Sequence, residues 1–539
     1  MSAEELTWTA PGEGVWWLTR EHFPRPVSRL FAALFSPVTV GWEQGAARYG
    51  LPMGEARWAA VNGWLYFSPG SPDPTSYPAL DDAAGETVAS YRWRDEVRRW
   101  FERERPAVVE ANRALQAVEP ARLDDDALAA HLDRAIAHFG SAATLHFEHT
   151  GFDIAAGRLL LAAAEWGLET APLTELFAGS SPASLANVAH LDRIAGALVA
   201  TGVSEPDSLD AVRAASPAAA DALDAYLGDC GWRLLEGHDL AEPTLGERPG
   251  IVLASLRARL SVPAGRSAPG AVDVDAIRSR VPDTDRDRFD ELLADARLTY
   301  QLRDDDVSVC FNWPLGLVRR AVLEAAGRLV ARGVLADGAH LFEAEPPELL
   351  ALLDGVGPPG AELAERAERR RTAGGAQPPS QLGEPLPPPA DVPLPASVTV
   401  LVAARDAYWA AGWSPAGPSA SSELQGTGIG DASYEGRACV IESGPDALAD
   451  LRPGDVLVAT ATTTAHNAVF PLVGAVATEE GGLFSHAAIL AREFGLPAVV
   501  GVAGLLDHVR TGDLVEIDSR TGRVGIIERN PAVHPPAIT

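Results

Sequence analysis

Helical periodicity dominates the chain before residue 376. From residue 123 to residue 139, apolar side chains recur at intervals of three and four after three aspartates, which predicts an amphipathic helix with an acidic first turn. Residues 313–333 have the same period and end at a glycine, a residue favoured just beyond a helix C-terminus. This region is therefore expected to be mostly helical. The apolar stripe of the first helix consists of Leu128, Leu132, Ala135, Ile136 and Phe139.

Short apolar runs replace this period after residue 422. One strong helical pattern lies among them, with Ser485 expected to cap its start and Gly495 expected to end it. Its core face consists of Ala487, Leu490, Ala491 and Phe494. Runs bounded by Gly, Pro and Asp predict strands at residues 438–441, 455–459, 497–501 and 513–518, and a turn with a further strand over 518–527.

Prolines separate the two patterns. Residues 376–396, AQPPSQLGEPLPPPADVPLPA, have almost no helical or strand potential and are expected to form an extended, polyproline-like spacer. We therefore expect a mostly helical domain over residues 1–375, a linker and connecting segment over 376–422, and a domain of strands with one strong helix over 423–530. The expected fold class is multidomain α+β.

Charge and composition exclude several classes of protein. The 539 residues carry a formal net charge of −30, which would repel a nucleic-acid backbone, and no basic membrane-binding segment is visible. No apolar run approaches the roughly 20 residues that span a bilayer, and the N-terminus lacks the pattern of a secretory signal. Three widely separated cysteines have no metal-type spacing, as expected of reduced thiols in a cytoplasmic protein. Arginine supplies every positive side chain, because the sequence contains no lysine.

His486 lies where an anion would bind. It follows Gly481 and Gly482 and falls in the first turn of the helix predicted after Ser485, where unpaired backbone N–H groups favour an anion such as phosphate. A neutral imidazole is nucleophilic near pH 7, and a phosphoryl group on its nitrogen leaves readily. The residues alone leave a second interpretation open, in which His486 is an ordinary helix-start histidine with a satisfied hydrogen bond.

The segment TEEGGLFSHAAILAREFGLPAVVGV, residues 478–502, resembles the phosphohistidine signature of the phosphoenolpyruvate (PEP)-utilising enzymes. That family includes phosphoenolpyruvate synthase, pyruvate phosphate dikinase and rifampin phosphotransferase. The resemblance implies a β/β/α swivelling domain that carries phosphate on His486 between two sites, with Gly481, Gly482, Ser485 and Arg492 supporting it. Residues 454–464 resemble the strand and threonine-rich loop before the signature.

The N-terminal region resembles the middle domain of rifampin phosphotransferase and the corresponding part of phenylphosphate synthase, over residues 16–31, 231–249 and 302–335. The resemblance implies an acceptor-binding domain, and it does not extend to the ATP-grasp domain of that family. A phosphate loop of the Walker type is also excluded, because it would need a lysine and the sequence contains none. The resemblance therefore implies a split kinase. A separate ATP-grasp subunit would bind ATP and Mg²⁺, with no cofactor held tightly by this chain, and convert ATP to AMP and phosphate.

The expected product of this chain is a phosphorylated hydroxyl, preferably a phenolic one on a small aromatic molecule. A phenol is easier to activate than an alkanol because its pKa is about 10. One alternative is a rifampin-like antibiotic phosphotransferase component. Others are a PEP-linked enzyme, which would need a barrel domain that the N-terminal pattern does not predict, and a non-catalytic phosphocarrier that regulates a partner.

Four side chains are candidates for the acceptor site. Arg233 and Arg303 could grip the travelling phosphoryl group, although each has acidic neighbours that could form a structural ion pair instead. His149 and His22 are candidate bases for the acceptor hydroxyl. His146 and His149 lie three residues apart, but two ligands without a third do not define a metal site, so none is predicted. The acidic runs 124–126 and 304–306 are expected to be solvated helix starts.

Overall fold

The computed structural model describes residues 6–20, 22–70, 72–235, 238–261, 273–384, 392–412, 424–441, 451–462, 466–467 and 469–531. The chain divides into two compact units. Unit 1 comprises Met1–Phe152, Gly237–Glu242 and Asp306–Ala403, and unit 2 comprises Asp153–Glu236, Pro243–Asp305 and Ala404–Thr539. The boundaries expected from the sequence between substrate domain, linker and strand-rich domain stay predictions.

Unit 1 combines helices with a four-stranded antiparallel sheet of order β2-β3-β1-β4. The mostly helical character is as expected, but the sequence analysis did not predict this sheet. The strands are β1 (Trp16–Leu18), β2 (Arg57–Val61), β3 (Trp64–Ser68) and β4 (Gln381–Leu382). The helices of unit 1 are α1 (Arg29–Phe35), α2 (Val40–Tyr49), α3 (Tyr77–Ser90), α4 (Arg92–Arg99), α5 (Arg105–Gln116), α6 (Asp125–Glu148), α15 (Trp313–Ala331), α16 (Pro346–Leu353) and α17 (Gly360–Gly374).

The sheet of unit 1 pairs strands that lie far apart in the sequence. Trp16 pairs with Leu382, so the proline-rich segment begins with an edge strand rather than being extended throughout. The described part of residues 376–396 therefore differs from the expectation, because two of its residues gain partners in β1. Residues 385–391 of that segment lie outside the described residues. Asn62 and Gly63 both have positive φ angles, 51° and 82°, as a two-residue turn between β2 and β3 requires.

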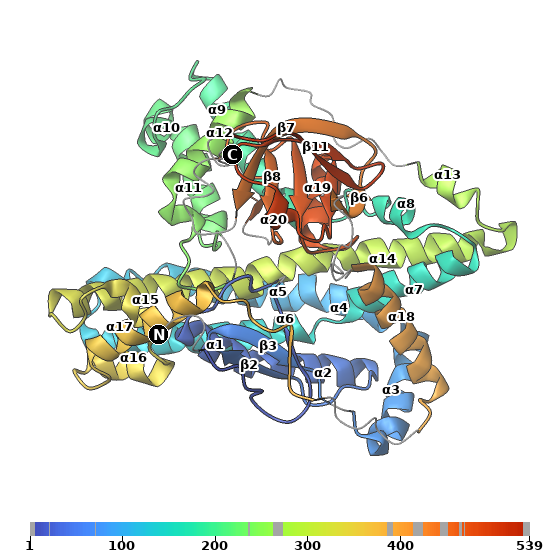
Figure 1. Cartoon of the computed structure of the whole chain (residues 1–539), viewed down its shortest axis with the longest axis horizontal. Coiled ribbons are helices and arrows are strands. Elements are labelled where there is room, and N and C mark those ends of the chain that lie inside the picture. The colour runs from blue at the N-terminus through green and yellow to red at the C-terminus, as the bar shows by residue number, and fades with distance from the viewer. Residues whose placement is uncertain are drawn as a thin grey trace, which may run out of the picture. The chain divides into compact units, whose positions relative to one another are not determined.

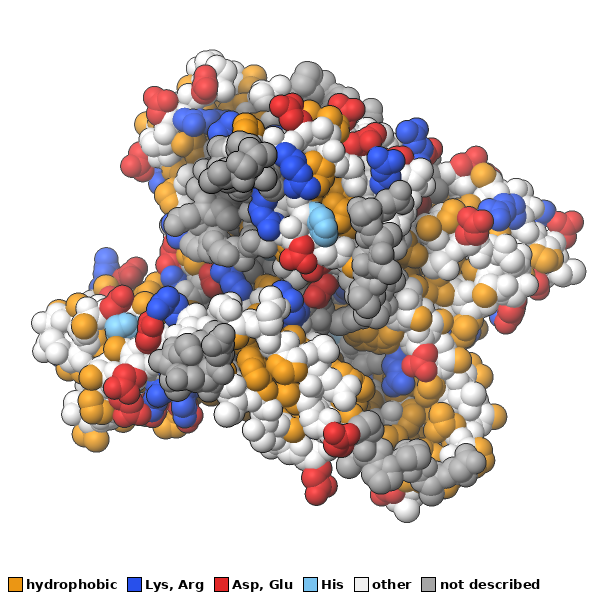
Figure 2. All heavy atoms as spheres, in the orientation of Figure 1, with side chains coloured by type: hydrophobic (Ala, Val, Ile, Leu, Met, Phe, Trp, Pro, Cys, Tyr) orange, Lys and Arg blue, Asp and Glu red, His pale blue; other side chains and the backbone are white. Residues whose placement is uncertain are grey.

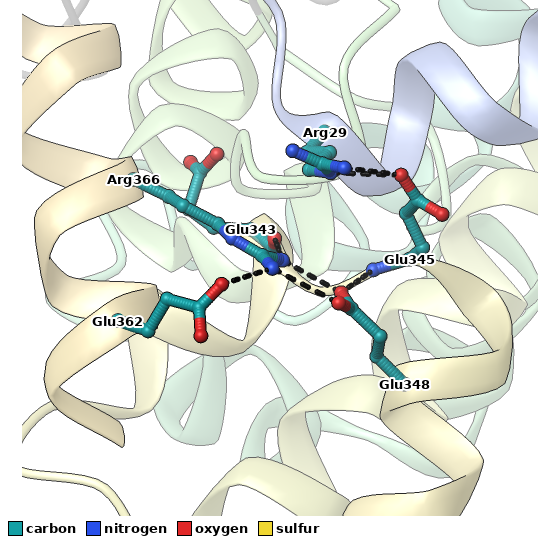
Figure 3. A network of polar contacts seen from close by, with 6 residues as sticks. All are labelled: Arg29, Glu343, Glu345, Glu348, Glu362 and Arg366. Carbon is teal, nitrogen blue, oxygen red and sulfur yellow. Dashed lines mark hydrogen bonds and ion pairs between the residues drawn. The ribbon is translucent and has the colours of Figure 1, made fainter. Parts of the chain in front are cut away.

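A network of arginine and glutamate side chains joins α16 and α17 of unit 1 (Figure 3). Arg366 on α17 donates to both carboxylate oxygens of Glu348 on α16, at 2.6 and 2.9 Å, and to Glu362 at 2.6 Å. Glu348 also accepts the backbone N–H of Glu345, at 2.9 Å, which caps the start of α16. The carboxylate of Glu345 in turn accepts from Arg29 on α1. The guanidinium of Arg366 therefore joins α16 to α17, and that of Arg29 joins α1 to the start of α16.

Unit 2 is built on an eight-stranded mixed sheet of order β5-β12-β11-β7-β8-β9-β10-β6. Strands β7 to β10 are parallel and form its centre, and the flanking strands are antiparallel. Its core includes Val458, Ala477, Val499 and Ile517, all fully buried. The strands are β5 (Leu424–Gln425), β6 (Thr427–Ile429), β7 (Ser433–Ile441), β8 (Val456–Ala459), β9 (Ala475–Thr478), β10 (Ala498–Val500), β11 (Leu514–Asp518) and β12 (Arg523–Glu528).

Helices flank this sheet, and Figure 1 shows α9 to α12 gathered beside it. Within unit 2 lie α8 (Thr170–Glu175), α9 (Pro182–Val199), α10 (Leu209–Ala215), α11 (Pro217–Cys230), α12 (Pro249–Ser261), α13 (Val274–Arg278), α19 (His486–Phe494) and α20 (Leu505–His508). Three helices belong to both units along the chain, namely α7 (Gly151–Glu165), α14 (Arg286–Asp306) and α18 (Ala396–Gly412).

Most elements expected from the sequence are present. The helix predicted after residue 123 is α6, the one over 313–333 is α15, and all five strands predicted after residue 422 form. Asp124 caps α6 as expected, but the run 304–306 does not start a helix: it ends α14, and all three aspartates are buried. That expectation was wrong because the chain brings partners to these carboxylates that the local sequence does not contain.

Charged side chains of both signs lie on the described surface. On the face drawn in Figure 2, basic side chains are scattered among acidic ones. All three cysteines are buried. Among the described residues, none of the helices has the length and apolar character needed to cross a membrane.

Candidate functional site

His486 begins α19, in the loop that follows β9 at the centre of the sheet of unit 2. The hydroxyl of Ser485 accepts the backbone N–H of Ala488, at 3.4 Å, so Ser485 caps the helix as predicted. Gly495 adopts the left-handed conformation, φ 63°, that ends it. The helix therefore has the bounds expected from the sequence, and the imidazole of His486 lies in its first turn.

The two glycines before His486 are required by close packing. A Cβ atom on Gly481 would lie 2.9 Å from Oγ of Ser485, and one on Gly482 would lie 2.7 Å from the carbonyl oxygen of Gly412 at the end of α18. Leu483 donates its N–H to the carbonyl of Ala411, at 3.1 Å, in the same contact. Gly482 thus lets this loop approach α18, and Gly481 leaves room for the side chain of Ser485. The support of a phosphate by these glycines stays a prediction.

The ring of His486 is held by an asparagine that the sequence analysis did not single out. Nε2 of His486 lies 2.8 Å from Oδ1 of Asn467. The backbone carbonyl of Asn467 accepts from the side chain of Asn187 on α9, at 2.9 Å. The only signal in the sequence is the polar pair His466–Asn467 within an otherwise apolar run, residues 465–473. Its proximity to His486 depends on the tertiary fold.

The surroundings keep His486 neutral. Burial lowers the pKa of His486 from 6.5 to about 4. The carboxylate of Asp304 opposes this shift of the pKa, whereas the neighbouring His466 reinforces it. The positive charges of Arg303 and Arg233 also lower the pKa. An imidazole in this environment carries a lone pair on one ring nitrogen at neutral pH, as a nucleophile must.

Both arginines predicted for the acceptor site lie close enough to His486 to act on its charge. Arg303, near the end of α14, donates to the backbone carbonyl of Phe484, two residues before His486. Arg233 is only 9% exposed, and its buried Nη1 has no hydrogen-bond partner among the described residues. A buried guanidinium nitrogen without an acceptor is costly and suits an anionic ligand. The structure therefore brings Arg233, Arg303 and His486 together.

Arg492 holds the loop that precedes His486. Its guanidinium donates to the carbonyl of Leu483 at 2.6 Å, to the hydroxyl of Thr174 at 2.8 Å and to the carboxylate of Glu175 at 3.0 Å. The sequence left open whether Arg492 would pair with Glu493. It pairs with Glu175 on α8 instead. In this structure Arg492 orders the loop, and direct support of a phosphate stays a prediction.

Glu493 makes a second link to the same segment. Its carboxylate accepts the backbone N–H of Gly179, at 3.0 Å, and that of Ser181, at 3.3 Å. Burial raises the pKa of Glu493 to about 7, although these hydrogen bonds act in the opposite direction. Two adjacent residues of α19 thus anchor it to α8 and to the loop that follows α8.

The two candidate bases lie in unit 1. His149 is buried, with Nδ1 2.7 Å from Asp306 and Nε2 3.4 Å from Glu104. Although burial opposes it, the hydrogen bonds with Asp306 and Glu104 raise the pKa of His149 to about 10. An imidazolium with carboxylates on both nitrogens cannot remove a proton, so these contacts do not suit a general base. His22 is exposed and lies edge-on to Phe23, with 6.4 Å between the ring centroids.

Comparison with known proteins identifies part of this region. Residues 451–522, which include His486 and both glycines, match the family model described as PEP-utilising enzyme, mobile domain. An uncharacterized protein of Mycobacterium tuberculosis is 30% identical over 426 residues, which are 76% of this chain and 44% of that protein. The chain therefore spans less than half the length of this relative.

Two further relatives are named as phosphotransferases. Rifampicin phosphotransferase of Streptomyces sviceus is 28% identical over 346 residues, covering 60% of this chain and 37% of that protein. An uncharacterized phosphotransferase of Bacillus subtilis is 27% identical over 323 residues, covering 57% of this chain and 36% of that protein. The chain is thus related to phosphotransferases over more than its strand-rich region.

Proposed function

We propose that His486 is a phosphocarrier and that the chain transfers the phosphoryl group to a hydroxyl, because residues 451–522 match the mobile domain of PEP-utilising enzymes. The observation that carries this proposal is the environment of His486. The imidazole is kept neutral at a helix N-terminus, and a buried, unpartnered nitrogen of Arg233 lies in the same surroundings. Such a ring has the lone pair that attacks phosphorus, and the arginines supply the charge that the phosphoryl oxygens need.

The residues have separate roles in this proposal. His486 forms the P–N bond and releases it when the acceptor attacks. Arg303 and Arg233 bind the phosphoryl oxygens, and Asn467 orients the ring. Asn467 can accept from a protonated Nε2 or, after its amide turns over, donate to an unprotonated one. Positioning and charge stabilisation supply most of the rate in phosphoryl transfer.

We assign nucleotide activation to a separate ATP-grasp polypeptide. The chain contains no lysine for a Walker-type phosphate loop, and its resemblance to split kinases of the phenylphosphate synthase type supports the division. ATP and Mg²⁺ would bind to that partner. Among the described residues, no group of three or more His, Cys, Asp or Glu side chains is arranged to hold a metal ion.

The expected acceptor is a small hydroxylated aromatic molecule, with a phenolic hydroxyl preferred. A second candidate is a rifamycin-type antibiotic, because a relative covering 60% of this chain is named rifampicin phosphotransferase. The two differ in size and are separated by a direct comparison of acceptors. A non-catalytic phosphocarrier would transfer to neither.

Labelled ATP tests the proposal. The chain is incubated with Mg²⁺ and ATP labelled in its β- and γ-phosphates, with and without an ATP-grasp polypeptide encoded beside it. We expect acid-labile label on the wild-type chain only when the partner is present, and none on His486→Ala. His508→Ala removes an exposed histidine of the same domain and is the matched control, expected to keep the label. Label on His486→Ala would exclude His486 as the carrier, and label without the partner would exclude the split arrangement.

A further inference from the structure

Arg233 is a buried arginine of unit 2 whose charge acts on neutral groups. Its side chain is only 9% exposed, and its Nη1 has no hydrogen-bond partner among the described residues. Its positive charge acts on Tyr226, Cys230 and His486. Burial raises the pKa of Tyr226 and that of Cys230 and lowers that of His486, so all three groups are neutral at pH 7. A buried guanidinium in such surroundings is unfavourable unless an anion binds to it.

The backbone on both sides of Arg233 is hydrogen-bonded, so the side chain starts from a fixed position. The N–H of Arg233 donates to the carbonyl of Cys230 at the end of α11, at 3.2 Å, and its carbonyl accepts the N–H of Leu245 at 2.8 Å. The next residue, Leu234, forms an isolated bridge with Thr244. The guanidinium is therefore held inside the unit before an anion arrives, and less side-chain entropy is lost on binding.

Two further features favour an anion beside His486. The imidazole lies in the first turn of α19, where backbone N–H groups have no partner within the helix. Arg303 reaches the same loop, because it donates to the carbonyl of Phe484. Like Arg233, Arg303 adds to the effect of burial and lowers the pKa of His486, so both guanidinium groups lie near the ring. The whole chain has a formal charge of −30, so this concentration of positive charge is local.

Asp304 places a hydrogen-bond acceptor beside these donors. Its carboxylate is only 5% exposed, and Oδ2 accepts from the hydroxyl of Ser181 at 3.1 Å. The charge of Asp304 opposes the effect of burial on the pKa of His486, so this carboxylate also lies near the ring. A carboxylate repels a fully ionised anion, but it can accept a hydrogen bond from the hydroxyl of hydrogen phosphate. Sulfate has no hydroxyl at neutral pH, so donors together with an acceptor favour phosphate.

We propose that inorganic phosphate binds beside unphosphorylated His486, in a site formed by Arg233, Arg303 and Asp304 and called the phosphate site below. The two arginines donate to phosphate oxygens, and the carboxylate accepts from the phosphate hydroxyl. The consequence for regulation rests on the proposed function, in which the partner converts ATP to AMP and phosphate. Because the same arginines bind the phosphoryl group of His486, free phosphate competes with phosphorylation of the ring. Accumulated phosphate therefore slows the enzyme that releases it.

Binding is tested on the unphosphorylated chain without a partner. Calorimetric titration with sodium phosphate at pH 7, in chloride buffer of constant ionic strength, is expected to show one site. Arg233→Gln is expected to weaken binding at least tenfold. Arg278→Gln is the matched control and is expected to bind normally, because it removes one positive charge of the same unit from a surface pair with Asp290, at 2.8 Å. Absence of binding, or equal binding by both variants, would exclude the phosphate site.

Thermal stability separates a ligand site from a structural role of Arg233. In phosphate-free buffer, Arg233→Gln is expected to keep or raise the Tm, because it removes a buried charge whose Nη1 has no partner among the described residues. Added phosphate is expected to raise the Tm of wild type and not that of Arg233→Gln, since a ligand stabilises the state that binds it. A lower Tm of Arg233→Gln without phosphate would indicate a structural arginine and contradict the proposal.

The choice between phosphate and sulfate tests Asp304. Sulfate is expected to bind wild type at least tenfold more weakly than phosphate, because no hydroxyl faces the carboxylate. In Asp304→Asn the difference should disappear, since an amide can donate to either anion. Equal binding of the two anions by wild type would contradict the acceptor role of Asp304 and the site as proposed.

Competition is tested with phosphoramidate, which phosphorylates histidine chemically and needs no partner or ATP. Phosphate is expected to slow labelling of His486, and the same concentration of sulfate is expected to slow it little. A chain already phosphorylated on His486 is expected to show no calorimetric binding of phosphate, because its own phosphoryl group occupies the site. Binding with wild-type affinity by the phosphorylated chain would place the phosphate elsewhere and exclude the proposal.

The outcomes separate this proposal from the proposed function. Labelling of His486 that phosphate does not slow would exclude the phosphate site and leave the phosphocarrier standing. Binding of phosphate that depends on Arg233, without acid-labile label on His486 from ATP and the partner, would support the phosphate site. That second result would contradict the proposed function and, with it, the regulation by released phosphate.

Discussion

Asn467 and His486 are joined by a 2.8 Å contact between Oδ1 and Nε2, although 19 residues separate them in the chain. The contact fixes the plane of the imidazole at the start of α19. It also offers a neutral partner, which does not draw a proton onto the ring as a carboxylate would. Replacing this amide by an acid should therefore change the reactivity of the ring.

Asn467→Asp is expected to slow phosphorylation of His486 at pH 7. A carboxylate beside Nε2 favours the imidazolium and raises the pKa of His486 from its present low value, so less of the ring keeps its lone pair. Asn467→Ala removes the hydrogen bond without adding charge and is expected to slow phosphorylation about fivefold, the equivalent of one ordinary hydrogen bond of about 1 kcal/mol. Rates of labelling by phosphoramidate measure both, and a faster rate in Asn467→Asp would contradict the role assigned to the amide.

The pH dependence of His486 should differ from that of an ordinary histidine. Its pKa is about 4 in the folded chain, against about 6.5 when exposed, so labelling is expected to stay constant from pH 8 to about pH 5. The neutral ring is favoured in the folded state. The contribution of His486 to the free energy of unfolding is therefore complete above pH 6.5 and is lost as the pH falls towards 4. The urea-unfolded chain is the reference, and its labelling should decline as the pH is lowered through about 6.5. The same decline in the folded chain would contradict the burial of His486.

Glu493 should make stability depend on pH in the opposite sense. In the folded chain the pKa of Glu493 is raised from 4.5 to about 7. The contribution of this carboxyl to the free energy of unfolding is therefore complete below pH 4.5 and is lost as the pH rises through 7. Glu493→Gln retains an oxygen for the N–H groups of Gly179 and Ser181 but cannot ionise. We expect its Tm to exceed that of wild type at pH 8 and to match it more closely at pH 5. Thermal unfolding at the two pH values measures this, and a larger gain at pH 5 would reverse the assignment.

Arg366 is expected to affect stability alone. Arg366→Met removes the guanidinium that joins Glu348 and Glu362 and leaves two carboxylates facing each other, a loss of about 1–3 kcal/mol because the carboxylates are partly exposed. Urea unfolding measures the loss. Arg371→Met, which breaks an exposed pair with Glu368 on the same helix, is the matched control and should change the unfolding free energy by less than about 0.5 kcal/mol. Labelling of His486 should be unchanged in both.

Local patterns in the sequence determined most elements and the central residue. The period of three and four gives α6, α15 and α19, because a helix buries one stripe, and the cap and glycine of α19 are set within a few residues of each other. The same short segment predicts that His486 lies in a first turn. The four-stranded sheet of unit 1 was missed because its strands are two to five residues long and its edge pairing joins Trp16 to Leu382.

Only the tertiary structure decided what surrounds these residues. Asn467, Arg233 and Arg303 reach His486 from separate segments, and the low pKa of the ring depends on burial that no local pattern encodes. His149 likewise gains Asp306 and Glu104, which lie far from it in the sequence. Hydrogen bonds and charges act over a few ångströms in space, whatever the separation in sequence, so the chain must fold before the environment of a histidine is defined.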